Sequence, residues 1–109
     1  MLSLRADDRV LLLAIPPVQE LTAIARILIA GCLVALGAAD EVDEGRQALR
    51  DFENVMFVEA TPDNVPWRDH FFTKIVVPHH LQRLVLESGP EMHRLLAPGG
   101  SLIQDVENA

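Results

Sequence analysis

The sequence has few of the residues on which several classes of protein depend. Its single cysteine, Cys32, excludes an internal disulfide and a zinc site made of cysteine thiolates, and it fits a reducing cytoplasm. Lys and Arg number nine, against sixteen Asp and Glu, and they form no basic run. Because nucleic acids and anionic lipids attract basic patches, the net charge of −7 argues against both as main partners. The chain has no Gly-x-Ser-x-Gly sequence, and we expect no catalytic nucleophile.

Long uninterrupted apolar segments are missing too. Residues 21–39 approach the length of a membrane-spanning helix, but Arg26 interrupts them, and Gly31 separates a part with helical periodicity from a part typical of a strand. Acidic residues precede the first apolar run, which is unlike a signal peptide. We therefore expect a cytoplasmic protein without a membrane partner. Its 109 residues, half of them apolar, are enough for one domain, residues 1–109, with its own hydrophobic core.

Three histidines are the best candidates for metal ligands. His79 and His80 are adjacent, and adjacent residues of a helix point about 100° apart, so their rings do not converge on one ion. His93 lies farther along the same predicted helix, and no Asp or Glu stands at helical ligand spacing to both members of the adjacent pair. The sequence therefore predicts no metal site.

Apolar runs of strand length alternate with segments of helical periodicity. Strands are predicted over residues 10–15, 32–37, 54–60, 74–78 and 101–106. These runs are apolar throughout rather than at alternate positions, which indicates burial on both faces. Strands of this kind that alternate with helices are typical of a parallel sheet between two helical layers, a three-layer α/β sandwich.

The segments between the strands contain three predicted helices, one loop and one turn. The first helix runs from Val18 to a stop at Gly31, the second covers residues 40–52, and the third covers 79–97 with a break at 88–90. The loop, residues 61–72, is rich in Pro, Asp and Asn. Pro98 and the two glycines after it are predicted to form a tight turn before the last strand.

Two stretches carry a resemblance to a known family. Residues 92–103, MHRLLAPGGSLI, are similar to a helix, a Pro-Gly-Gly turn and the fifth strand of the class I S-adenosylmethionine-dependent methyltransferases. Residues 57–77, FVEATPDNVPWRDHFFTKIVV, resemble the family's third strand, the following loop and its fourth strand. Residues 10–13 and 33–36 fit its first and second strands. The resemblance covers essentially the whole chain and implies a Rossmann-like sheet of order 3-2-1-4-5 without the family's last antiparallel strands.

The resemblance implies a glycine-rich loop after the first strand, where the backbone approaches the methionine part of the cofactor. The positions of those glycines fall on Ala14, Pro16 and Val18. Proline holds φ near −65°, and a β-branched valine is strained at positive φ. The loop is therefore predicted not to adopt the conformation that holds the cofactor.

The resemblance also implies two acidic residues that bind the adenosine part. The acid that accepts the ribose hydroxyls falls on Gly37, with Asp40 three residues later, and the acid that reads adenine falls on Thr61, with Asp63 two residues later. An Asp that often precedes the fourth strand is replaced by Thr73. Each missing charged hydrogen bond costs on the order of 1.5–3 kcal/mol, so these losses together weaken binding by several decades.

These departures suggest a degenerate methyltransferase-like domain that is not an enzyme, needs no cofactor and acts through self-association or a protein partner. The alternative is a divergent methyltransferase that binds S-adenosylmethionine through Asp40, Asp63 and the backbone of residues 14–17, completed by a partner. A third hypothesis is another small molecule in the crevice at the carboxyl ends of strands one and four. Trp67 is expected either to cap the core beneath its loop or to line a pocket.

The last predicted strand suggests how self-association would occur. The family's antiparallel strands after the fifth strand have no counterpart in the sequence, which leaves that strand at an open edge. An apolar edge invites pairing with another chain, and two copies related by a two-fold axis would form one continuous sheet. We therefore expect a homodimer. Its predicted contact residues are Ser101, Leu102, Ile103, Gln104 and Val106.

Overall fold

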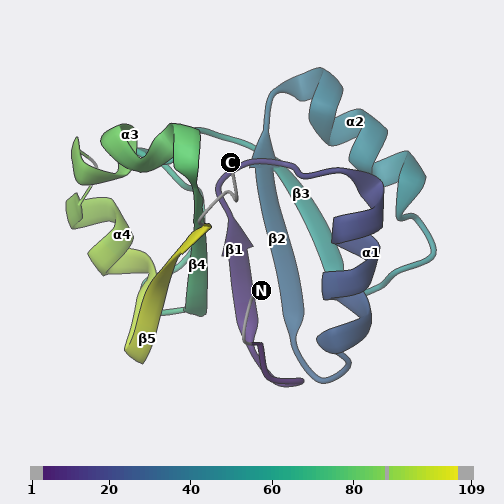
Figure 1. The fold of residues 1–109 in the computed structure, drawn as a ribbon, viewed down its shortest axis with the longest axis horizontal. Helices are drawn as coiled ribbons and strands as arrows, with labels where there is room; N and C mark the ends of the chain where they lie inside the picture. The colour runs from purple at the N-terminus through teal and green to yellow at the C-terminus, as the bar shows by residue number, and fades with distance from the viewer. Residues whose placement is uncertain (1–3, 88, 106–109) are drawn as a thin grey trace.

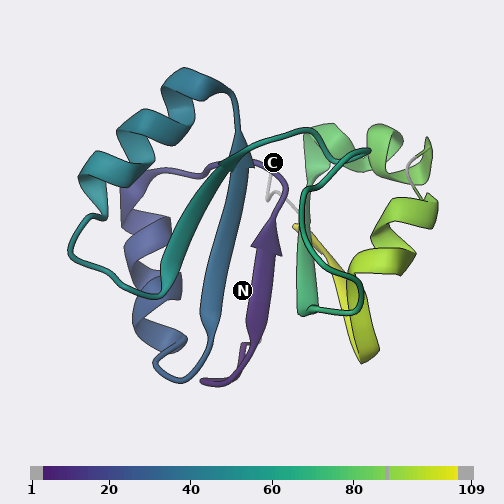
Figure 2. The same cartoon turned by 180° about the vertical axis from the view of Figure 1, so that it is seen from behind.

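A computed structural model describes residues 4–87 and 89–105, in which strands and helices alternate (Figures 1 and 2). The elements are β1 (Arg9–Leu12), α1 (Val18–Ile27), β2 (Cys32–Gly37), α2 (Ala39–Ala48), β3 (Val55–Glu59), β4 (Phe72–Pro78), the short 3-10 helix η1 (His79–Leu81), α3 (Gln82–Glu87), α4 (Gly89–Leu95) and β5 (Leu96–Asp105).

The five strands form one parallel sheet of order β3-β2-β1-β4-β5. Val10 of β1 pairs with Leu33 of β2 on one side and with Lys74 of β4 on the other. Helices α1 and α2 cover one face of the sheet and α4 covers the other, which makes three layers (Figure 1). The predicted fold class and strand order are confirmed.

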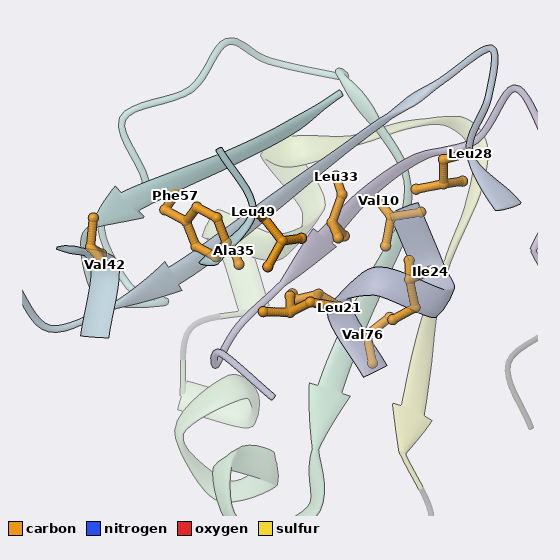
Figure 3. Close-up of a cluster of buried hydrophobic side chains, with 11 residues drawn as sticks. Val10, Leu21, Ile24, Leu28, Leu33, Ala35, Val42, Leu49, Phe57 and Val76 are labelled. Atoms are coloured by element: carbon orange, nitrogen blue, oxygen red, sulfur yellow. The ribbon is translucent and has the colours of Figure 1, made fainter. Parts of the chain in front are cut away.

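The central strands are apolar at every position because both of their faces are buried. Val10 and Leu12 belong to the core cluster beneath α1 and α2, which Figure 3 shows, whereas Leu11 and Leu13 belong to the cluster beneath α4. Each of these side chains is at most 4% exposed. Burying one leucine or valine contributes about 1.5–3 kcal/mol to stability. Because alternate side chains of the strand are buried on opposite faces, both helical layers are packed against the sheet.

The turn from α1 into β2 explains why a glycine stands at position 31. A Cβ there would lie 2.0 Å from the carbonyl oxygen of Asp8, so the backbone has room only for glycine. The helix itself ends at Ile27, four residues before the predicted stop. Its end is held by the Asn54 amide, which donates to the carbonyls of Ala25 and Leu28 at 2.9 Å each.

The Pro-Gly-Gly segment differs from its prediction. Strand β5 begins at Leu96, which pairs with Phe72, and pairing resumes at Ser101 opposite Lys74. One residue of β4 therefore faces four residues of β5, and the segment forms an irregular bulge within the strand rather than a turn before it. Gly99 takes a positive φ of 80° within this bulge, which glycine does without strain.

The first strand is shorter than predicted, whereas the predicted division of residues 21–39 into a helical part and a strand is confirmed. Strand β1 ends at Leu12 rather than at residue 15, and its last ladder-like bond is from the N–H of Leu13 to the carbonyl of Val76 at 3.3 Å. Prolines 16 and 17 have no N–H with which to extend the ladder. Within residues 21–39, α1 ends at Ile27, β2 occupies Cys32–Gly37 and α2 begins at Ala39. No helix in the described part of the chain is long and apolar enough to cross a membrane.

Trp67 packs against the core cluster beneath α4. Its ring centroid lies 5.7 Å from that of Phe71 and 5.9 Å from that of Phe72, in tilted arrangements. Such aromatic contacts stabilise a core beyond the area that they bury. Of the two expectations for Trp67, this placement matches the one in which it caps the core beneath its loop.

Candidate ligand crevice

The carboxyl ends of β2 and β3 border a pocket of about 490 Å³. In open parallel sheets, ligands bind outside the carboxyl ends of the strands. Two positions that the sequence singled out, Gly37 and Thr61, lie together in the wall of this pocket. The other lining residues are Ala38, Glu59, Ala60, Asn64 and Pro66.

The space beside Gly37 is occupied by the side chain of Ile15. A Cβ on Gly37 would lie 2.7 Å from Cδ1 of Ile15 and 3.2 Å from Oε1 of Glu41. An acidic side chain at this position would therefore collide with Ile15 unless the end of that side chain moved. The carboxylate of Glu41 is also engaged, because it accepts a hydrogen bond from the N–H of Ala38 at 2.9 Å and caps α2.

The loop after β1 does not have the conformation of a glycine-rich loop. Among the described non-glycine residues only His70 has a positive φ, so neither Ala14 nor Val18 is left-handed. Pro17 precedes α1 with φ −56° and ψ 153°, and Val18 is the first helical residue. Pro16 and Val18 line a separate pocket of about 330 Å³, together with Glu41 and other residues of α2. Of the predicted cofactor positions, Gly37 and Thr61 thus line the larger pocket, Pro16 and Val18 line the smaller one, and Ala14 lines neither.

Asp40 and Asp63, the alternative acids, line neither pocket. Asp40 is exposed in the first turn of α2, and Asp63 is exposed and accepts a hydrogen bond from Oγ1 of Thr61 at 2.5 Å. The carboxylate in the wall of the larger pocket is that of Glu59, which pairs in register with Gly37. Neither Glu59 nor Ile15 was predicted as a site residue from the sequence, although Glu59 could have been found from the alignment of the ends of β2 and β3.

Arg94 of α4 fixes the loop that forms the outer wall of the larger pocket. Its guanidinium donates to the carbonyls of Val65 at 2.9 Å and Trp67 at 2.7 Å, on either side of the lining residue Pro66. Glu91 binds the same guanidinium and accepts from the N–H of Val65 at 2.8 Å. The hydrogen bonds from Arg94 lower the pKa of Glu91, against the opposing effect of burial. The pocket wall is therefore held by an ionised pair.

Thr73 belongs to a cluster at the opposite end of the strands. Its hydroxyl donates to Oδ1 of the buried Asp8 at 2.8 Å, and Oδ2 of Asp8 accepts from the N–H of Arg5 at 2.7 Å. Nζ of Lys74 lies 3.5 Å from Oδ1. Burial raises the pKa of Asp8, but the hydrogen bonds and the Lys74 charge outweigh it, so the net pKa lies below the ordinary value. Thr73 therefore serves a structural cluster at the amino ends of β1 and β4.

No three His, Cys, Asp or Glu side chains within the described residues are grouped as metal ligands would be. Cys32 is half-buried, and burial raises the pKa of its thiol. A raised pKa leaves the thiol protonated and poorly nucleophilic at neutral pH.

Comparison with known proteins points to one fold. No family model matches the chain. The ubiquinone/menaquinone biosynthesis C-methyltransferase UbiE of Coxiella burnetii is 33% identical over 64 residues, which cover 54% of this chain. The match covers 26% of that relative, so the chain spans about a quarter of the length of the curated relatives that it matches.

Two solved structures agree with this relationship. A SAM-dependent methyltransferase from Aquifex aeolicus has a TM-score of 0.73 at 17% identity, with 86% of this chain and 53% of that chain covered. Geranyl diphosphate C-methyltransferase from Streptomyces coelicolor A3(2), crystallised with S-adenosyl-L-homocysteine, has a TM-score of 0.74 at 16% identity, with 92% and 39% covered. With the observed strand order, these similarities show that the chain has the Rossmann-like fold of the class I S-adenosylmethionine-dependent methyltransferases.

Proposed function

We propose that this domain keeps the methyltransferase scaffold, does not hold S-adenosylmethionine in the manner of the family, and acts through contact with protein. The observation that carries the proposal is the position of Ile15, whose side chain fills the space beside Gly37 where the family has a ribose-binding carboxylate. The conformation of the loop that contains Pro16 and Pro17 supports the same conclusion, because it has no left-handed residue.

The size of the expected loss follows from the hydrogen bonds involved. Two charged hydrogen bonds to the cofactor would be absent at Gly37 and Thr61, each worth about 1.5–3 kcal/mol. Their sum corresponds to a loss of roughly 10²- to 10⁴-fold in affinity, which turns a micromolar ligand into a submillimolar or weaker one.

The alternative, a divergent methyltransferase, rests on a different observation. The pocket beside Thr61 and Glu59 remains open, and the relatives named above are methyltransferases. Such an enzyme would hold S-adenosylmethionine with Asp40, Asp63 and the backbone of residues 14–17, and a partner chain would complete it. Another small molecule in the same crevice is the remaining alternative.

Thermal unfolding separates the proposal from this alternative. We expect S-adenosylmethionine and S-adenosylhomocysteine, each at about 1 mM, to raise the melting temperature by a few degrees at most. A dissociation constant of about 100 μM would add about 1.4 kcal/mol of stability at that concentration, a rise of roughly 5 °C or more for a domain of this size. A rise of that size with either ligand would contradict the proposal.

The protein contact that we favour is self-association along β5. Among the described residues, β5 pairs with β4 alone and is one edge of the sheet. Residues 101–104 carry no charge, and Leu102 is 42% exposed. The other edge is different, because Arg46 donates to the carbonyl of Phe57 in β3 at 3.1 Å. Two acidic chains could therefore pair along residues 101–104 of β5 without bringing like charges together. Val106, also predicted at this contact, lies outside the described residues.

A further inference from the structure

A third pocket forms a groove between the end of α2 and the outer edge of β3, at a position distinct from the crevice at the strand ends. Its volume is about 280 Å³. Its lining residues are Arg46, Leu49, Arg50, Phe52, Val55, Met56 and Phe57. The polypeptide between α2 and β3 runs past the outer side of the sheet (Figure 2), so the groove is at the periphery of the molecule.

The floor of this groove is apolar and its shape is fixed by the core. Leu49 and Phe57 are at most 5% exposed and belong to the core cluster drawn in Figure 3. Phe52 and Val55 are half-buried against the same cluster. The ring of Phe57 is packed so closely on α2 that a Cβ on Gly45 would lie 2.5 Å from it. A ligand would therefore meet a preformed apolar surface rather than flexible side chains.

The rim of the groove carries two guanidinium groups. Arg46 lies in the last turn of α2 and Arg50 lies two residues beyond the end of the helix, and both line the groove. The chain has sixteen acidic side chains, yet within the described residues neither arginine is within ion-pair distance of a carboxylate. Arg46 uses one N–H to bind the carbonyl of Phe57, and this contact holds its guanidinium at the groove.

We propose that this groove binds a small organic anion, a carboxylate attached to a short apolar body. The apolar body would lie on Leu49, Phe52 and Val55, and the carboxylate would accept charge-assisted hydrogen bonds from the two guanidiniums, whose planar forks match its geometry. The volume is at the low end for ligand pockets, which favours a short chain or a single ring. An extended peptide along β3 fits less well, because Arg46 already occupies the carbonyl of Phe57.

The test is a titration of the purified protein with octanoate, followed by two-dimensional amide NMR, with 1-octanol as the probe that lacks the charge. We expect saturable shifts at residues 46–57 with octanoate and binding at least about ten-fold weaker with octanol. Arg50→Gln should weaken octanoate binding by about ten-fold or more, because the substitution removes one charged donor. The Arg50 side chain makes no hydrogen bond within the described structure, unlike that of Arg46, so the substitution should leave the fold unchanged.

The matched control is Arg26→Gln, which removes an exposed arginine from the last turn of α1, outside the groove. It should leave octanoate binding unchanged because Arg26 does not line the groove. It changes the net charge by the same amount as Arg50→Gln, so any difference between the two variants comes from the position of the arginine. Equal binding of octanol and octanoate, equal effects of Arg50→Gln and Arg26→Gln, or shifts centred on Gly37 instead of residues 46–57 would each overturn the proposal. The absence of saturable shifts would overturn it as well.

Discussion

Asp8 is a buried carboxylate whose partners come from two separate parts of the chain. The N–H of Arg5 and the side chains of Thr73 and Lys74 together hold its pKa below the ordinary value of 3.8, although burial acts in the opposite direction. A carboxylate with a lowered folded-state pKa stabilises the protein above its unfolded-state pKa. That contribution is lost as the pH falls through the folded-state pKa.

Asp8→Asn should therefore lower the free energy of unfolding at pH 7 by about 1.5–3 kcal/mol, and the difference from the parent protein should shrink at pH 3. Urea unfolding at both pH values measures this difference. Asp7→Asn, at the exposed neighbouring position, is the control and should change stability little at either pH. A difference between the parent protein and Asp8→Asn that is the same at both pH values would contradict the role assigned to the ionised carboxylate.

At the same scale, the resemblance predicted Gly37 and Thr61 as the positions of the family's two adenosine-binding acids, and both line the larger pocket. It could not identify Ile15 as the residue that fills the space beside Gly37, because that contact depends on where the loop after β1 places a side chain relative to β2. Nor could periodicity show that Asp40 and Asp63 lie outside the lining of the pocket, since both follow the strand ends closely in sequence.

At the scale of elements, helix α4 and the loop before β4 act as one unit. Arg94 binds the carbonyls of Val65 and Trp67 and the carboxylates of Glu91 and Asp69. A lysine could not make these contacts at once, because it has one nitrogen where arginine has three in a planar fork. This unit sets the position of the outer wall of the larger pocket.

Arg94→Gln should free residues 65–69 and lower the free energy of unfolding by about 1.5–3 kcal/mol, the range for hydrogen bonds to charged groups. Hydrogen exchange of the amides in this loop should accelerate more than that of the central strands. Arg68→Gln is the control, because Arg68 contacts the ring of Phe71 at 4.8 Å and is exposed, a contact worth about 1 kcal/mol or less. Equal rates of amide hydrogen exchange in residues 65–69 of the two variants would contradict the role assigned to Arg94 in fixing this loop.

Element type was easier to predict than element limits. The strands β2 and β3 agree with their predicted ranges to within a residue, because both are nearly unbroken apolar runs; in β2 this run is buried on both faces, whereas in the edge strand β3 only Phe57 is fully buried. The end of α1 and the start of β5 were misplaced because they are set by contacts distant in sequence, namely Asn54 with the helix end and Phe72 with Leu96.

At the scale of the molecule, the two edge strands of the sheet differ in how readily they could pair with a strand of another chain. The outer side of β3 has a carbonyl occupied by Arg46, whereas β5 presents an uncharged segment. Leu102→Lys on β5 and Met56→Lys on β3 are a matched pair, since the two side chains are 42% and 38% exposed. We expect the parent protein and Met56→Lys to be dimers by light scattering at micromolar concentration and Leu102→Lys to be a monomer, because an edge lysine opposes strand pairing. A monomeric parent protein, or a dimeric Leu102→Lys, would contradict pairing along β5.

Our central proposal is that this domain keeps the five-stranded methyltransferase scaffold but lacks the residues with which the family holds S-adenosylmethionine. Its most direct measurement is calorimetric titration of the parent protein with S-adenosylhomocysteine, beside a variant that combines Ile15→Ala with Gly37→Asp. We predict binding to the parent protein that is weaker than about 100 μM and a gain in affinity in the variant, where the space beside β2 is cleared and a carboxylate is supplied. Binding to the parent protein with a dissociation constant below about 100 μM would show that the claim is wrong.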